Sequence, residues 1–443
     1  MILRLDRAFK DRSQSDPSWF WPLLIGVVVA GAIVRVAFAL SVMSRPLPAD
    51  AGFFHVAAAG LVHGKGYSAA GTPTASHPPA FPALLAILDL FDLRSIGAQR
   101  IAVSIVTSAA VLLVGMLGRK VAGAKVGIAA AVIAVLDPLW FQPSGILMSE
   151  SIYLVAIPAI LLVSLMCLER PTLWRFGILG LLIAVATLIR SDAIALIVVL
   201  GLPVLLLATR GWRGRLVNGL LLLAGFALVL TPWLVRNDVQ LGGATLSTDG
   251  GVTLAGSYCT STFDSQSASY GSFNIICALI AARDAGPLTG PRVPSALARD
   301  RTVTKEAETF ARGHLGAMPR VVLARELSVW GFGNQSFQQT LATAEGRDSG
   351  AERAGTIVYW ILLPFVLLGA VVLARNSRKV LFLLAMPLVV VALNAAVFYG
   401  STRLRTGAEP SLAVLGALGV VAATEVVLRS RRHVTAGSAA TTP

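Results

Sequence analysis

The stretch FWPLLIGVVVAGAIVRVAFALSVM, residues 20–43, decides the class of this protein, because Arg35 is its only charged residue. A membrane core about 30 Å thick requires roughly 20 apolar residues per helix. Similar runs recur along the 443-residue chain, of which 55% is hydrophobic and 14% charged. An average soluble domain has about a quarter of its residues charged. The sequence therefore predicts an all-α polytopic membrane protein and excludes disordered, fibrous and disulfide-scaffold classes.

We expect about ten transmembrane helices, each at least close to the length that a bilayer requires. The apolar runs lie at 20–43, 101–118, 126–141, 151–168, 176–190, 193–208, 216–235, 356–374, 380–399 and 410–428. The first run is longer than the h-region of a cleaved signal peptide, which has about 7–15 residues. We therefore expect it to remain as a helix.

The positive charges indicate how the chain is oriented. Lys and Arg cluster in short segments between runs, whereas the connections 142–150, 191–192 and 400–409 contain only Arg403 and Arg405. Cytoplasmic loops carry the excess of Lys and Arg. We expect both termini in the cytoplasm, and the net charge of +14 then requires no nucleic-acid partner.

This orientation divides the chain into four regions. An N-terminal membrane module, 1–235, has seven spans and a long first outside loop, 44–100, with amphipathic interfacial helices at 50–63 and 80–91. A larger extracytoplasmic loop domain, 236–355, contains a helix broken near Gly313 and Pro319. A C-terminal module of three spans, 356–428, precedes a cytoplasmic tail, 429–443.

Two of the three cysteines, Cys259 and Cys277, lie in the large outside loop. Cysteines on the oxidising side of a membrane can pair. We expect a Cys259–Cys277 disulfide, with two free buried thiols as the alternative.

The chemistry-bearing residues gather at the outside ends of the spans. The sequence has neither a phosphate-binding loop motif nor a dinucleotide-binding fingerprint, which disfavours a nucleotide-driven pump. The span centres are nearly free of ionisable groups, which disfavours an ion-coupled transporter. Arg35 is the exception, either reaching toward outer headgroups or binding phosphate. Asp50, just beyond the first span, is either a helix N-cap or a catalytic base at the membrane surface.

Several motifs carry a family resemblance. Asp50 with Phe53 and Phe54, followed by HPPAFPALLAIL (77–88), resembles the first outside loop of the glycosyltransferase C superfamily, in its bacterial branch of protein O-mannosyltransferase-like and aminoarabinose transferase-like enzymes. Further matching stretches, in order, are LDPLWFQPSGILMSESIYL, LIRSDA, TPWLVRN, LSTDGGVTLAGSYC and RLRTGAEP. The use of Ala, and of Arg over Lys, suggests a bacterium of high GC content. The resemblance implies a multi-pass protein of the bacterial plasma membrane.

The resemblance implies an inverting transfer of a sugar from a polyprenyl-phosphate donor to a hydroxyl of a glycan, lipid or protein acceptor, on the extracytoplasmic side. Asp50 is then the catalytic base, and Glu150 a second acidic residue that positions the acceptor or binds a metal. Donor-phosphate ligands are expected among Arg403, Arg405, Arg236, His77 and Lys65, with Arg190 a weaker candidate. For each of these residues the alternative is a structural role, such as a headgroup anchor or a helix N-terminal carboxylate.

A divalent metal ion is a possible cofactor, because many relatives carry an acidic pair in the first loop. Here Asp50 is followed by Ala51, and Phe53 or Phe54 replaces the usual tyrosine. Two other function classes stay open, a polysaccharide polymerase or ligase and a lipid-linked glycan flippase or transporter. Apolar spans disfavour the transporter, and an aspartate directly after the first span disfavours the polymerase.

Overall fold

The computed structural model describes residues 17–69, 71–286 and 295–439, and almost all of its regular structure is helical. Within these residues, eight helical segments are long and apolar enough to cross a membrane: α2 (Phe20–Ser41), α5 and α6 (Ile96–Ala122), α9 (Glu150–Glu169), η2 to α11 (Ser191–Ala208), α12 (Trp212–Leu241), α19 (Ser349–Asn376), α20 (Arg378–Val397) and the first part of α21 (Glu409–Leu428). The prediction of an all-α polytopic membrane protein is confirmed.

The two remaining predicted spans differ from simple helices. The run at 126–141 forms α7 (Ala124–Leu136) and α8 (Pro138–Gly145), which are bent by 52°. Pro138 lacks an N–H group to continue the ladder, and the Asp137 carboxylate instead accepts a hydrogen bond of 2.9 Å from the Leu139 N–H. The run at 176–190 forms α10 (Leu173–Ile189), a shorter apolar helix.

The first long connection contains the two expected helices, and a hairpin that the sequence did not predict lies between them. Helix α3 (Ala49–Val62) and helix α4 (Ala80–Leu90) nearly match the predicted ranges 50–63 and 80–91. Strands β1 (Ser68–Ala69) and β2 (Thr72–Pro73) pair antiparallel.

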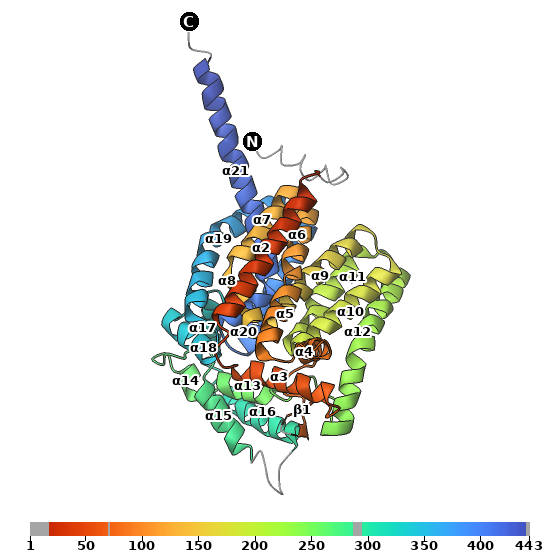
Figure 1. Cartoon of the computed structure of the whole chain (residues 1–443), viewed down its shortest axis with the longest axis vertical. Helices are drawn as coiled ribbons and strands as arrows, with labels where there is room; N and C mark the ends of the chain where they lie inside the picture. Colours follow the sequence, from red (N-terminus) through yellow and green to blue (C-terminus); the bar gives the residue numbers. More distant parts are fainter. Residues whose placement is uncertain (1–16, 70, 287–294, 440–443) are drawn as a thin grey trace.

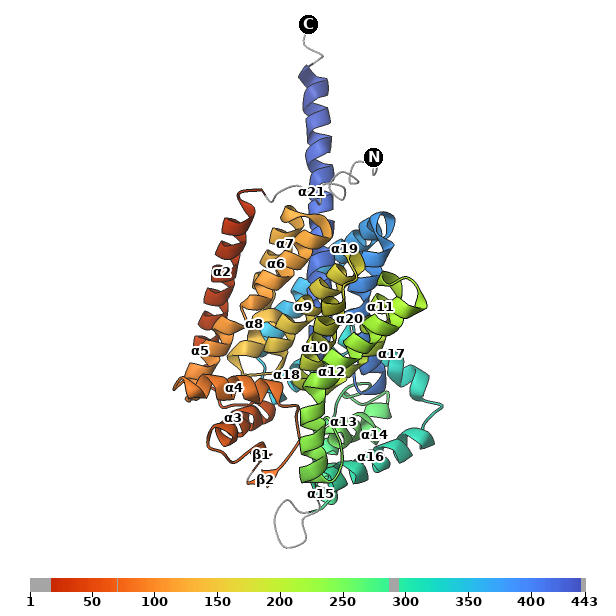
Figure 2. The same cartoon turned by 90° about the vertical axis from the view of Figure 1, so that its right-hand side faces the viewer.

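The second long connection is also helical. It contains α13 (Gly250–Ser257), α14 (Thr260–Phe263), α15 (Ile275–Asp284), α16 (Ala296–Gly313), α17 (Met318–Val329) and α18 (Gln335–Ala344). The expected break in the helix lies between α16 and α17. In Figure 2, α3, α4, the hairpin and α13–α16 gather at one end of the bundle, and α21 (Glu409–Ala439) extends from the other end. The two connections that the sequence assigns to one side of the membrane thus lie together.

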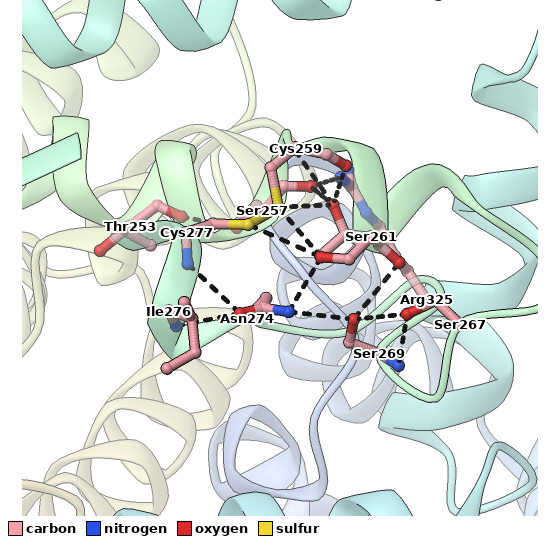
Figure 3. Close-up of a disulfide and its surroundings, with 11 residues drawn as sticks. Thr253, Ser257, Cys259, Ser261, Ser267, Ser269, Asn274, Ile276, Cys277 and Arg325 are labelled. Atoms are coloured by element: carbon pink, nitrogen blue, oxygen red, sulfur yellow. Dashed lines mark hydrogen bonds between the residues drawn. A yellow bond between two sulfur atoms is a disulfide. The ribbon is translucent and has the colours of Figure 1, made fainter. Parts of the chain in front are cut away.

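A disulfide ties the second connection together. Cys259, directly before α14, is bonded to Cys277 of α15 with a sulfur–sulfur distance of 2.14 Å (Figure 3). Asn274 caps α15, and its amide donates to the hydroxyl oxygens of Ser261 and Ser269. Covalent and hydrogen-bonded links therefore order the segment between α13 and α15.

Three buried arginines, Arg35, Arg100 and Arg325, bind backbone carbonyl groups in the described part of the chain. Arg35 is fully buried and donates to the carbonyl oxygen of Trp140, 3.2 Å away, in bent helix α8. It therefore neither reaches the outer headgroups nor lines a phosphate pocket. Arg100 binds the last carbonyls of α2, and Arg325 those of α20.

Glycines allow the closest helix contacts. A Cβ atom on Gly180 of α10 would lie 1.9 Å from the carbonyl oxygen of Leu222 in α12, and one on Gly419 of α21 would lie 1.9 Å from that of Phe365 in α19. Small residues let transmembrane helices approach closely. This packing fixes the end of α10, where Arg190 lies, and the helix that follows Arg403.

Candidate functional site

A cavity of about 650 Å³ lies where the bundle meets the two long connections. Ligand sites typically have about 300–1,000 Å³. Its polar lining includes Asp50, His77, Arg190, Asp192, Asp249 and Arg403. Its apolar lining includes Ile189, Ile194, Phe398 and Leu404, which come from the ends of α10 and α20, from η2 (Ser191–Ile194) and from η4 (Thr402–Gly407). One cavity therefore offers both polar and apolar surfaces.

Asp50 lies in the first turn of α3 but does not cap it. Pro48 occupies the N-cap position, and the Asp50 carboxylate instead pairs with Arg403, with 3.0 Å between Oδ2 and Nη2. Its other oxygen lies 3.7 Å from Nε2 of His77. The side chain is 31% exposed. Burial raises the pKa of this carboxyl, but attraction to Arg403 and His77 outweighs burial and holds the pKa below its usual value.

Arg403 joins carboxylates from three distant parts of the chain. Its guanidinium binds Asp50, Oε1 of Glu150 and, at 3.6 Å, Oε1 of Glu345. The arginine belongs to η4, whose first turn is capped by the Ser401 hydroxyl. Burial lowers the pKa of Arg403, but the carboxylates outweigh burial and raise the pKa. The guanidinium therefore stays charged.

Glu150 lies behind the cavity rather than in its lining. It begins α9, and its side chain is 3% exposed. Oε1 accepts from Arg190 at 2.7 Å and from Arg403, and within the described residues Oε2 has no hydrogen-bond partner. Arg190 also pairs with Asp192, which accepts a hydrogen bond from Asn394 of α20. Glu150 thus holds two cavity-lining arginines in place.

Three predicted phosphate ligands do not line the cavity. Arg405 is fully buried, pairs with Glu409 at 2.7 Å and stacks on Tyr359. Arg236 donates to the carbonyl oxygens of Tyr67 and Thr74, which hold the hairpin against α12. Lys65 is exposed in the turn after α3. Of the predicted ligands, the structure brings Arg403 and His77 to Asp50.

Residues that the sequence prediction did not assign to the site also line the cavity or support it. Asp192 and Asp249 line it, and Glu345 binds Arg403. Asp192 and Asp249 lie in the family-like stretches LIRSDA and LSTDGG, so the signal was present without a role attached. Glu345 is in a stretch without a motif.

The side chains around Asp50 do not fit a divalent metal ion. Arg403 occupies one Asp50 oxygen, and no group of three or more His, Cys, Asp or Glu side chains suited to a metal occurs in the described parts of the chain. A catalytic metal site usually has three protein ligands. We therefore derive no chemical step through a metal.

Comparison with known proteins gives one family and several structures. Residues 76–235 match the family model "Dolichyl-phosphate-mannose-protein mannosyltransferase". No curated protein matches the chain. The archaeal oligosaccharyltransferase AglB of Archaeoglobus fulgidus, in complex with an inhibitory peptide and a dolichol-phosphate, is similar to 95% of this chain at 14% identity and a TM-score of 0.57. The apo form of the Archaeoglobus fulgidus oligosaccharyltransferase is similar to 95% of this chain, at 13% identity and a TM-score of 0.55.

The chain spans about half, 52%, of the length of these archaeal chains. ArnT of Cupriavidus metallidurans, bound to undecaprenyl phosphate, matches over 89% of this chain and 77% of its own length, with 16% identity and a TM-score of 0.42. At these identities the similarity to the archaeal chains shows the fold.

Proposed function

We propose that this chain, which has the membrane fold of the glycosyltransferase C superfamily, is an inverting glycosyltransferase. The donor is a sugar on a polyprenyl phosphate, and the acceptor is a hydroxyl group. The reaction takes place on the extracytoplasmic side of a bacterial plasma membrane. This sidedness rests on the short connections, because Lys and Arg cluster in those of one side while 142–150, 191–192 and 400–409 on the other side contain only Arg403 and Arg405.

One observation carries the proposal: an ionised carboxylate and a partly buried arginine meet in a cavity between apolar span ends and a polar loop domain. Asp50 and Arg403 form this pair. A lipid-linked phosphate has an apolar tail, an anionic group and a sugar, and these parts require apolar, cationic and polar surfaces. Ile194 and Phe398 supply the apolar surface, and Arg403 and Arg190 supply the cationic surface.

The arrangement supports a single displacement. The acceptor oxygen attacks the anomeric carbon, its bond to that carbon forms, and the bond from that carbon to the phosphate oxygen breaks. The electron pair leaves on the phosphate, beside Arg403 and Arg190, whose fork-shaped guanidinium groups suit phosphate oxygens. The acceptor proton passes to the Asp50 carboxylate. Attack opposite the leaving group inverts the anomeric configuration.

The lowered pKa of Asp50 is consistent with its role as the proton acceptor. Arg403 keeps the carboxyl ionised at neutral pH, so it is ready to take a proton. An alcohol becomes strongly acidic as its oxygen bonds to the anomeric carbon, and the transfer therefore becomes favourable late in the reaction. Glu150 acts by positioning Arg403 and Arg190, since it does not line the cavity.

Mass spectrometry of the cell envelope tests the proposal. A deletion strain is expected to lose one glycosyl residue from a glycan, glycolipid or glycoprotein. A plasmid encoding the wild-type chain restores that residue, and one encoding Asp50→Asn at equal abundance does not. An envelope unchanged by the deletion contradicts the proposed function.

A further inference from the structure

The segment 244–253 closes one wall of the cavity, and we call it the roof. Ala244, Thr245, Leu246, Ser247, Asp249, Gly250 and Thr253 of this segment line the cavity. Arg190 and Arg403 line the same cavity. The hydrogen bonds that the roof already makes within the protein therefore limit which part of a substrate it can bind.

The roof is held rigidly by neighbouring elements. Trp233 of α12 donates its indole N–H to the Leu246 carbonyl at 2.9 Å, and the Thr248 N–H donates to the Ala75 carbonyl at 2.8 Å. On the other side, the Gly251 N–H donates to Asp300 of α16 at 2.6 Å. The backbone of the roof is thus fixed before any ligand arrives.

The hydroxyl groups of the roof have already used their protons. Thr245 donates to the Ser247 carbonyl at 2.7 Å, Ser247 to the Ser76 carbonyl at 2.6 Å, and Thr253 to the Asp249 carbonyl at 2.9 Å. A hydroxyl has a single proton to donate and two lone pairs that accept. These three side chains can therefore only accept hydrogen bonds from a ligand.

Asp249 adds an unpaired carboxylate to this wall. It is half-buried, and its carboxylate makes no hydrogen bond or ion pair among residues 17–69, 71–286 and 295–439. Asp50, by contrast, is bound by Arg403. Burial, together with Asp50 and Asp300, raises the pKa of Asp249 to about 6, while His77 and Arg403 oppose the rise. A desolvated carboxylate without a partner favours a ligand that donates hydrogen bonds.

We infer that the roof is the acceptor subsite and that Asp249, with Thr245, Ser247 and Thr253, binds neighbouring hydroxyl groups of a carbohydrate acceptor. The inference rests on the proposed function and specifies its acceptor. The Asp249 carboxylate and the acceptor hydroxyls repel a phosphate, whereas Arg190 and Arg403 attract it. The roof matches a sugar, whose several hydroxyls each donate a hydrogen bond. A serine or threonine side chain offers a single hydroxyl and leaves most of the roof unsatisfied.

Ligand binding without turnover tests the inference separately from the reaction. The full chain in lipid nanodiscs is titrated with methyl hexosides and, separately, with acetylated serine and threonine peptide amides, by saturation-transfer NMR. Hexosides are expected to bind, and Asp249→Asn and Asp249→Ala are expected to weaken binding by about 10-fold or more, because they remove a charge-assisted hydrogen bond. Asp264→Asn is the matched control, an exposed carboxylate of the same connection outside the cavity.

Undecaprenyl phosphate binding should be equal in all four proteins, since the roof does not hold the phosphate. Hexoside binding that is undetectable, or unaffected by both Asp249 variants while their thermal unfolding is normal, overturns the inference. Peptide binding that depends on Asp249 in place of hexoside binding also overturns it. A cell envelope that is unchanged by the deletion, together with normal hexoside binding by the purified chain, would instead count against the proposed function.

Discussion

Arg403 is the residue on which the geometry of the site depends, because its guanidinium meets Asp50, Glu150 and Glu345 at once. A lysine keeps the charge but cannot form the planar, forked contact. We expect Arg403→Lys to reduce sugar transfer by about 10²-fold and to lower the thermal unfolding temperature, since Glu150 then loses a buried partner. Transfer assays and thermal unfolding of the purified variant measure both effects. Wild-type values for both would show that the guanidinium contacts are dispensable.

Asp249 gives the site a pH dependence. Its carboxyl, with a pKa of about 6, faces His77, Asp50, Asp300 and Arg403. The ionised form is the better hydrogen-bond acceptor, so hexoside affinity should be full near pH 7.5 and fall as the pH drops through 6. Titrations between pH 5 and pH 8 check this, and the fall should be absent in Asp249→Asn. If hexoside affinity falls in the same way in Asp249→Asn, a group other than Asp249 causes the pH dependence.

Some of the predicted site residues line the cavity and others do not, for a physical reason. Asp50, His77 and Arg403 meet in the cavity, but Arg405 does not reach it. Both arginines follow the same span, and position along the chain does not distinguish them. They lie two apart in a 3₁₀ helix, which has about three residues per turn, so their side chains point in different directions. Only the three-dimensional structure shows that Arg405 turns toward Glu409.

At the scale of the elements, hydrophobic runs locate helices well but do not show how helices bend. The amphipathic helices of the first connection lie nearly where the sequence predicts them. The run at 126–141 looks continuous by hydropathy, yet it bends at Asp137 and Pro138. The proline and the capping carboxylate together were a signal of this break. The Trp140 carbonyl, just after this bend, accepts a hydrogen bond from buried Arg35.

The contact of α19 with α21 depends on the absence of a side chain at Gly419. Gly419→Ala places a Cβ atom 1.9 Å from the Phe365 carbonyl oxygen. The helices must separate, and we expect a loss of about 1–3 kcal/mol in unfolding free energy. Gly26→Ala is the matched control, since no atom lies within 4 Å of its Cβ position. Thermal unfolding in one detergent compares the two, and equal stability would contradict the close packing.

At the scale of the whole molecule, the charge distribution predicts which ends of the helices share a side, and the structure places both long connections at one end of the bundle (Figures 1 and 2). Which side of the membrane that end faces is still a prediction. The assembly of the cavity from residues as distant as Asp50 and Arg403 could not be predicted from spacing, because it requires the packing of many helices.

Ser295, the exposed N-cap residue of α16, provides a test of sidedness. A single cysteine at this position, with Cys167, Cys259 and Cys277 replaced, should react with a membrane-impermeant thiol reagent in intact cells. The reason is that α16 lies at the end of the bundle that carries the cavity (Figure 2). A cysteine at Ser377, between α19 and α20, is the control that should react only after lysis. The opposite pattern would reverse the orientation.

Asp50 is the proposed proton acceptor of the sugar transfer, and Asp50→Asn tests this role most directly. Asparagine keeps the size of the side chain, and the substitution removes no cap because Pro48 holds the N-cap position. The measurement is the rate of sugar transfer from a polyprenyl-phosphate donor by purified protein, with Asp264→Asn as control. We predict a fall of about 10²-fold or more for Asp50→Asn with unchanged thermal unfolding. A folded Asp50→Asn protein that transfers sugar at a near-normal rate would contradict the account.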